Sequence, residues 1–270
     1  MKRKHSLWIG TLVTALLGCG DDTTSGGGGS GAGGSAVGGG GQGGTTSGGG
    51  GAGGGLAGLT ATWHFAEYTA PNPPDVVDYQ LVGPNADLEV CLFDESRCAT
   101  TDADGNAQIT GLSPETNIAI VAQKPGFSPL LLQYVVHSTD PMFGSGWQND
   151  DELLGYIGSS GCTVPPAPGK ANLWVGIGPG MSVTSSPPMT FVYTAEDGVF
   201  DPALTMVPVT TPPLLALAVA CDLDPGTFEL SIAGGLGNCH MVEGWPPAAG
   251  GDLQVLTSAG AITVVNWICE

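Results

Sequence analysis

Basic residues are scarce in this sequence. Only 6 Lys and Arg stand against 25 Asp and Glu among 270 residues, which gives a formal net charge of −19. Such a chain repels phosphate backbones and anionic headgroups, so we expect no nucleic-acid partner. The acidic excess favours a protein kept soluble by its surface charge over a cation binder, because no acidic cluster has a dense ligand spacing.

Catalytic and nucleotide-binding motifs are also missing. The part of the sequence expected to fold has no Gly-x-Ser-x-Gly, no His-Glu-x-x-His and no phosphate-cradling glycine loop followed by Lys. Two glycine-rich stretches, 144–146 and 158–161, are predicted to be loops. We therefore expect no catalytic residue, no metal ligand, no cofactor and no enzyme activity; a hydrolase with an unfamiliar site is the weaker alternative.

The N-terminus lacks an apolar run long enough to span a membrane. A basic start, Lys2-Arg3-Lys4, precedes the apolar segment Leu7 to Leu17, which is shorter than the roughly 20 residues that a spanning helix needs. With the following Leu16-Leu17-Gly18-Cys19, this region resembles a bacterial lipoprotein signal peptide that ends in a lipobox. The resemblance implies cleavage before Cys19 and lipid on its sulfur, hence a membrane anchor in the cell envelope, with the outer membrane favoured.

Processing of this kind makes the chain more acidic and leaves an even number of cysteines. Three basic residues then remain against 25 acidic ones, a net charge of −22. The other cysteines are Cys91, Cys98, Cys162, Cys221, Cys239 and Cys269. Export permits disulfides, and six cysteines allow about 15 pairings.

Spacing favours one of these disulfide pairings over the others. If residues 93–96 form a turn, Cys91 and Cys98 lie opposite each other on adjacent strands. Cys239 with Cys269 and Cys162 with Cys221 complete the predicted set. Zinc binding is the competing interpretation, but the sequence has no Cys-x-x-Cys and the spacings match no zinc module.

Composition divides the chain into five segments. Residues 1–18 are the predicted signal peptide, and 19–55 are the lipidated cysteine and a disordered Gly/Ser-rich linker; residues 25–55 alone hold 20 of the 46 glycines. Such a linker cannot bury enough apolar surface to order itself. The remainder is predicted to comprise a β-sandwich over 56–145, a connecting segment over 146–168 and a second β-sandwich over 169–270.

Short alternating apolar runs separated by Gly, Pro, Asn and Asp predict an all-β fold with two sandwich modules. Trp63 and Phe65 share one face of the first strand. A brief helix is expected over 151–157, and the last two strands are expected to form a hairpin through 258–260. The predicted strands are 60–68, 76–81, 88–93, 107–110, 117–122, 130–136, 171–177, 190–194, 215–221, 228–233, 252–257 and 261–268.

Three turns give the first module a family resemblance. Thr101-Asp102-Ala103-Asp104-Gly105 precedes a predicted strand, Gly111-Leu112-Ser113-Pro114 follows it, and Lys124-Pro125-Gly126-Phe127 comes after the next strand. The module resembles a carboxypeptidase regulatory-like domain of prealbumin-like topology; the second is similar more loosely, through Asp224-Pro225-Gly226-Thr227. The resemblance implies Ig-like or prealbumin-like sandwiches that support, display or bind, without catalysis.

The remaining polar motifs each have a structural alternative. Asp102-x-Asp104-Gly105 could begin a calcium loop, but the later ligands are missing and a tight turn uses the same residues. The segment 196–198, near Asp201, receives the same interpretation. His64-x-x-Glu67 and His240-x-x-Glu243 match a pair found in zinc carboxypeptidases, but residues three apart on a strand point to opposite faces.

Aromatic residues and the module architecture leave two classes of function open. Trp147, Trp174, Trp245 and Trp267 could form sugar-binding platforms, although tryptophans in sandwiches are more commonly core residues. We expect a lipid-anchored, non-catalytic protein that binds an envelope or extracellular glycan or protein. A structural spacer or scaffold for a neighbouring enzyme is the alternative.

Overall fold

Three β-sheets make up most of the structure, as the alternating apolar pattern predicts. The computed structural model describes residues 58–69, 80–211, 216–235, 238–247 and 250–269. The predicted signal peptide, the linker and Cys19 lie outside these residues. No helix among the described segments has the length and apolar character to cross a bilayer.

The sheets are named A, B and C. Sheet A contains β1 (Leu59–Thr69), β2 (Gln80–Pro84), β5 (Asn106–Leu112) and β8 (Met142–Trp147). One part of sheet B contains β3 (Glu89–Leu92), β4 (Cys98–Thr100), β6 (Thr116–Lys124) and β7 (Phe127–Val136). Its other part contains β9 (Ala171–Gly176), β11 (Val192–Thr194), β12 (Phe200–Asp201), β13 (Leu217–Leu223), β15 (Cys239–Met241) and β17 (Ile262–Cys269). Sheet C contains β10 (Met181–Ser186), β14 (Gly226–Gly234) and β16 (Leu253–Thr257).

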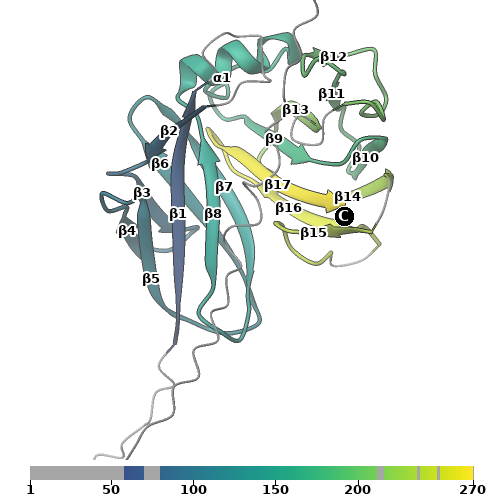
Figure 1. The fold of residues 1–270 in the computed structure, drawn as a ribbon. Coiled ribbons are helices and arrows are strands. Elements are labelled where there is room, and N and C mark those ends of the chain that lie inside the picture. The colour runs from purple at the N-terminus through teal and green to yellow at the C-terminus, as the bar shows by residue number, and fades with distance from the viewer. Residues whose placement is uncertain (1–57, 70–79, 212–215, 236–237, 248–249, 270) are drawn as a thin grey trace, which may run out of the picture. The chain divides into compact units, whose positions relative to one another are not determined.

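The first sandwich forms where sheet A packs on strands β4, β3, β6 and β7 of sheet B (Figure 1). Trp63 and Phe65 of β1 are both buried, which confirms their predicted common face. They meet Ile120 of β6 and Leu132 of β7, and β5 pairs with β1 along the same layer. This core is a β-sandwich, and it also contains Trp147, Leu153 and Ile262, which lie outside the predicted module 56–145.

The second sandwich uses the opposite face of sheet B. Leu173 and Val175 of β9 pack with Leu230 of β14 and Val255 of β16 in a separate core. Because successive strand residues point to opposite faces, β17 serves both sandwiches: Ile262 lies in the first core and Val265 in the second. The two β-sandwich modules predicted from the sequence are therefore present, but they share one sheet.

Strand β17 joins the two modules and corrects one prediction. It runs parallel to β7 on one side and to β9 on the other, so sheet B is continuous from β4 to β12. Residues 53–270 form one compact unit. The predicted hairpin of the last two strands is wrong, since β16 pairs with β14 in sheet C. Residues buried on both faces of β17 require a central position in a covered sheet, which a hairpin would not provide.

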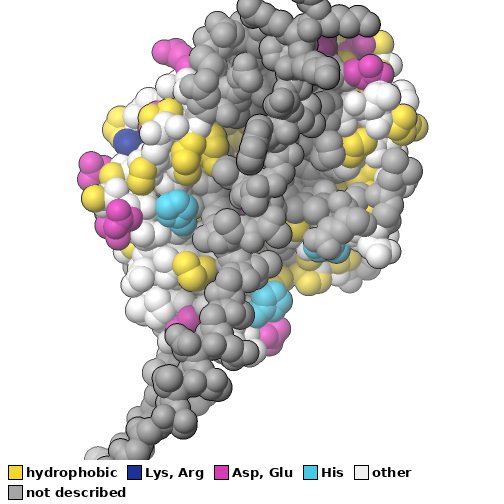
Figure 2. Space-filling view, in the orientation of Figure 1, with side chains coloured by type: hydrophobic (Ala, Val, Ile, Leu, Met, Phe, Trp, Pro, Cys, Tyr) yellow, Lys and Arg dark blue, Asp and Glu magenta, His cyan; other side chains and the backbone are white. Residues whose placement is uncertain are grey.

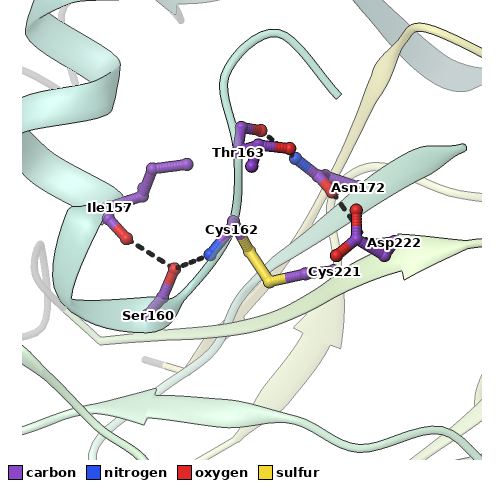
Figure 3. The surroundings of a disulfide bond; sticks show 7 residues. All are labelled: Ile157, Ser160, Cys162, Thr163, Asn172, Cys221 and Asp222. Carbon is purple, nitrogen blue, oxygen red and sulfur yellow. Dashed lines mark hydrogen bonds between the residues drawn. A yellow bond between two sulfur atoms is a disulfide. The ribbon is translucent and has the colours of Figure 1, made fainter. Parts of the chain in front are cut away.

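A short helix and a disulfide cover the second half of sheet B, on the same face as sheet A and beyond its reach. Helix α1 (Asp150–Ile157) begins at Asn149, whose side chain accepts the Glu152 N–H, and the 3₁₀ helix η2 (Gly158–Ser160) follows. Tyr156 and Ile157 pack with Val219 of β13. The Cys162–Cys221 disulfide fastens the segment after η2 to β13, and the Ser160 hydroxyl donates to the Ile157 carbonyl at 2.6 Å (Figure 3).

Short strands are where the structure departs from the sequence prediction. The helix expected at 151–157 is confirmed, and β4 was expected only through the Cys91–Cys98 pairing across a turn. Strands β8, β10, β12 and β15 were not predicted. The stretch 144–146, predicted to be a loop, lies within β8, and 158–160 forms η2. The predicted strand 76–81 lies mostly outside the described residues.

Candidate functional site

Strand β8 forms one border of sheet A and is held by pairing on one side. It runs parallel to β1, with Thr62 opposite Met142 and Ala66 opposite Gly146. Phe143 turns inward, where its ring stacks on Tyr134 of β7 with centroids 4.0 Å apart and lies 5.5 Å from that of Trp63. Trp147 is also buried. These inward aromatic residues fix β8 above β7.

The backbone of β8 has an outward edge, called the open edge, that pairs with none of the described strands. The Thr62 N–H donates to the Pro141 carbonyl at 3.0 Å, so the bonds to β1 use residues 141, 143, 145 and 147. The N–H and C=O groups of Met142, Gly144 and Gly146 therefore point away from β1. No described strand pairs with this side of β8. All three residues are exposed, so their backbone groups can reach a partner.

The side chains on this edge leave it accessible. Met142 is 72% exposed, and the next two outward positions are glycines. A Cβ atom added to Gly146 would lie 2.5 Å from the nearest atom of the Tyr68 ring. Any larger residue at 146 would therefore displace the tyrosine. The edge lacks the charged or proline blocking residues that usually protect a strand of this length.

In contrast to β8, the border strands of sheet C have backbone groups that are hydrogen-bonded by side chains. On β10, the Tyr193 hydroxyl accepts the Val183 N–H at 2.9 Å and donates to the Val183 carbonyl at 3.0 Å. On β16, the Leu256 N–H donates to the Gln133 side-chain oxygen at 2.7 Å. Side chains thus occupy the outer hydrogen-bonding positions of these two strands.

A second polar region involves residues 242–245, which lie between β7 and β17 where these two strands separate. The Gly244 N–H donates to the Gln133 carbonyl of β7, and the Val242 N–H donates to the Asn266 carbonyl of β17, both at 2.9 Å. The Trp245 indole N–H donates to the Ile118 carbonyl at 3.0 Å. This segment, which we name the wedge, connects the two sandwiches.

The wedge places one carboxyl group in a buried polar cluster. Glu243 is 7% exposed and accepts a hydrogen bond from the Asn266 amide, for which Gly176 leaves space on the neighbouring strand. Burial raises the pKa of Glu243 to about 7, against the effects of Asn266 and Tyr134. Burial, and then the Glu243 charge, raise the pKa of Tyr134 well above its ordinary value.

The basic residues of the described chain are all engaged in local contacts. Arg97 pairs with Glu95 at 2.7 Å, Lys170 pairs with Asp224 at 2.8 Å, and Lys124 donates to the Asn85 side chain at 2.9 Å. Most carboxylates in the described segments form no ion pair with Lys or Arg. On the part of the sheet A face formed by described residues, acidic side chains appear at several places and Lys or Arg is rare (Figure 2).

The predicted disulfides are present where the structure describes both cysteines. Cys91 and Cys98 lie opposite each other on β3 and β4 and are bonded, as their spacing predicts. The Cys162–Cys221 disulfide is also confirmed. Cys239 is disulfide-bonded, and the backbone register places it opposite Cys269 of β17. Their pairing stays a prediction.

The polar motifs singled out in the sequence do not converge on one site. The Asp102 carboxylate accepts the N–H groups of Asp104 and Asn106, so it closes a tight turn. His64 contacts Asn106 at 3.1 Å, and His240 is exposed while Glu243 is buried. Among the described segments, one group of three has metal-ligand spacing, Glu89 with Cys91 and Cys98, and its two sulfurs are bonded to each other.

The four tryptophans considered as sugar-binding platforms pack against the cores. Trp147 and Trp174 contact the first core, Trp267 the second, and Trp245 a smaller cluster with Leu131 and Ala261. The sequence did not predict strand β8, because Gly144 and Gly146 are typical of a loop. The available signal was the period of two in Phe143, Ser145 and Trp147, which places every second residue on the inner face.

Comparisons with known proteins give no family. No family model matches the chain, and no curated protein matches it. Among solved structures, a cohesin and X-dockerin complex from Acetivibrio cellulolyticus is 16% identical over 32% of this chain and 52% of that chain, with a TM-score of 0.25. The Bacillus anthracis TIE protein is 12% identical over 78% of this chain and 34% of that chain, with a TM-score of 0.23. A leucine-rich repeat protein from Bacteroides thetaiotaomicron VPI-5482 is 10% identical over 78% of this chain and 26% of that chain, with a TM-score of 0.18.

These likenesses cover about half, a third and a quarter of the matched chains. At such TM-scores they carry no argument about function. The functional proposal therefore depends on the geometry of this chain.

Proposed function

We propose that this protein is a lipid-anchored, exported, non-catalytic binding protein that displays two β-sandwiches to an envelope or extracellular component. The observation that carries the proposal is the open edge of β8, which offers backbone groups that no described strand pairs with. Strand addition to such an edge is a common mode of protein recognition. Its partner is a protein or a glycan of the envelope.

The disulfides and the predicted leader support an exported location. Disulfides persist in oxidising compartments, and this chain has two that join described strands or segments. A lipid on Cys19 followed by the glycine-rich segment would tether the sandwiches to a membrane, with the outer membrane favoured. Several acyl chains would give stable anchoring where one chain binds only marginally.

A binding screen tests the proposed function. Residues 53–270, which form one compact unit with its own cores, are immobilised and exposed to envelope glycans and surface proteins of the host. We expect a saturable partner that is retained on washing. A spacer for a neighbouring enzyme would instead show no partner in this screen, while the full anchored protein would co-purify with that enzyme in mild detergent.

The anchor is tested separately in the native host. We expect the mature protein to begin at Cys19 with acyl chains attached and to sediment with membranes, whereas Cys19→Ser releases it into the soluble fraction. Mass spectrometry of the N-terminal peptide checks the modification. An unmodified Cys19 in membrane-bound protein would contradict the anchor and leave the binding function intact.

A further inference from the structure

We infer that the open edge of β8 accepts an extended, basic peptide segment of a partner protein, which adds to sheet A as a further strand. The inference rests on the proposed function, because it specifies the surface that binds and the chemistry that it recognises. Three features carry it: the unpaired backbone groups, the surface beyond β8, and the charge of the chain.

The first feature is the hydrogen-bonding edge. The outward residues Met142, Gly144 and Gly146 alternate along β8, which is the spacing that an incoming strand requires. Glycine at two of the three positions lets the partner backbone approach closely. The covered borders of sheet C show that this fold can satisfy exposed edges with its own side chains, and on β8 no described side chain does so.

The second feature is the surface over which the added strand would lie. Because Phe143 of β8 stacks on Tyr134 of β7, and β17 is the next strand of sheet B, a strand beside β8 extends sheet A over β17 (Figure 1). Val264 of β17 lies on this face and is only partly buried, beside Trp174 of β9, whose ring contacts Tyr156 of α1. An apolar side chain of the incoming strand can cover Val264.

The third feature selects a basic segment. Asp140 stands two residues before β8, and Asp150 and Asp151 begin α1 three residues after its end. Asp140 accepts the Thr60 N–H, and Asp150 accepts the N–H and hydroxyl of Ser128. Arg97, Lys124 and Lys170 are engaged elsewhere, so no described basic side chain pairs with these three carboxylates. A second copy of the chain carries the same net charge of −19 and is repelled.

A peptide-binding experiment tests the inference. The probe is a dye-labelled eight-residue peptide of alternating lysine and valine, and fluorescence anisotropy measures its binding to residues 53–270. We expect saturable binding that Gly144→Pro weakens at least about tenfold, since proline removes the outward N–H and its ring blocks the edge. Gly144→Ala keeps the N–H and is the matched control, expected to bind nearly as well as the unchanged protein.

The peptide backbone provides a second measurement that does not depend on how the variants fold. Two versions of the probe carry N-methyl groups on alternate residues, one on the lysines and the other on the valines. Both keep their charge, so ionic attraction alone predicts equal binding. Strand addition predicts that one version loses binding and the other retains it, because only alternate N–H groups face β8.

The outcomes separate this inference from the proposed function. Equal binding of both methylated probes, or Gly144→Pro binding as well as Gly144→Ala, overturns the β8 site. A Gly144-dependent dimer in light scattering also overturns it, because the occupant would then be a second copy. If an envelope partner binds Gly144→Pro as tightly as the unchanged protein, the proposed function stands and the β8 site is wrong. If the probe binds in a Gly144-dependent way but no envelope partner is found, the site is supported and the proposed function is contradicted.

Discussion

Glu243 brings a titratable group into the contact between the two sandwiches. Its carboxyl is buried beside Asn266 and near Tyr134, and its folded pKa of about 7 lies above the ordinary value of 4.5. A group whose pKa is raised on folding stabilises the protein fully below its unfolded pKa. That stability is lost as the pH rises through the folded pKa.

We therefore expect the free energy of unfolding to fall between about pH 4.5 and pH 8 by on the order of 3 kcal/mol through this group. Glu243→Gln removes the charge and keeps an oxygen for the Asn266 amide, so its stability should be flatter over this range and higher at pH 8. Urea unfolding at several pH values measures the difference.

The matched control for this titration is Asp94→Asn. This substitution makes the same charge change at an exposed residue, and asparagine tolerates the positive φ of 61° found there. The control should keep the pH dependence of the unchanged protein. If Glu243→Gln kept it as well, the buried carboxyl would not be the titrating group.

Tyr193 protects the outer edge of β10 with its hydroxyl. Because this group both accepts from and donates to Val183, Tyr193→Phe leaves a buried N–H and a buried carbonyl without these bonds. We expect a loss of about 1 to 3 kcal/mol in the free energy of unfolding. Thermal or urea unfolding measures it, and unchanged stability would show that water replaces the hydroxyl at this edge.

At the scale of elements, the sequence predicts a strand best where its inner residues are apolar and its outer ones polar. The strand β1 met this condition, with Trp63 and Phe65 inside. Strand β8 did not, because Gly144 and Gly146 occupy its outer positions and glycine is typical of loops. The alternation of Phe143, Ser145 and Trp147 is a weak strand signal, and only the pairing with β1 on one side makes the segment a border strand with an open edge.

The two confirmed disulfides differ in the length of chain that they close. Cys162–Cys221 spans 59 residues and Cys91–Cys98 spans 7. In the chain-entropy account, the longer loop should contribute about 4 kcal/mol and the shorter about 2 kcal/mol. Replacing Cys162 and Cys221 together by Ala should therefore destabilise the protein more than the matched double replacement of Cys91 and Cys98.

Hydrogen exchange locates the effect of the longer disulfide. Without it, α1 keeps the packing of Tyr156 and Ile157 against β13 but loses its covalent connection to that strand. We expect faster amide exchange in 150–162 and little change in β3 and β4. Uniform acceleration across both sandwiches would contradict a local role.

At the scale of the whole molecule, sheet B makes the two sandwiches interdependent. Strand β17 pairs with both β7 and β9, and the wedge adds bonds from Gly244 to Gln133 and from Trp245 to Ile118. Shared strands favour cooperative unfolding. We expect a single urea transition with coincident fluorescence and circular dichroism.

Removing side-chain bonds between the two sandwiches, at the wedge and at Gln133, should make the sandwiches unfold in separate transitions. Gln133→Ala together with Trp245→Ala removes the bonds to Leu256 and Ile118 while leaving both main cores intact. We expect the fluorescence and circular dichroism transitions to diverge by a measurable urea concentration. Trp267→Phe, which alters the second core without touching the wedge, is the control and should lower stability while keeping one transition.

The sequence by itself determined the all-β class, the two sandwich cores, the short helix and the Cys91–Cys98 and Cys162–Cys221 disulfides. All but the last follow from local alternation, turn residues and short cysteine spacing, which act over a few residues. The Cys162–Cys221 pair, 59 residues apart, is the one that the other predicted pairs leave. Tertiary structure decided that β17 leaves β16 and enters the centre of sheet B, that Glu243 is buried at the wedge, and that 142–147 becomes a strand with an open edge. Each depends on partners far away in the chain, because a strand's neighbours are chosen by which faces remain to be covered and not by its own residues.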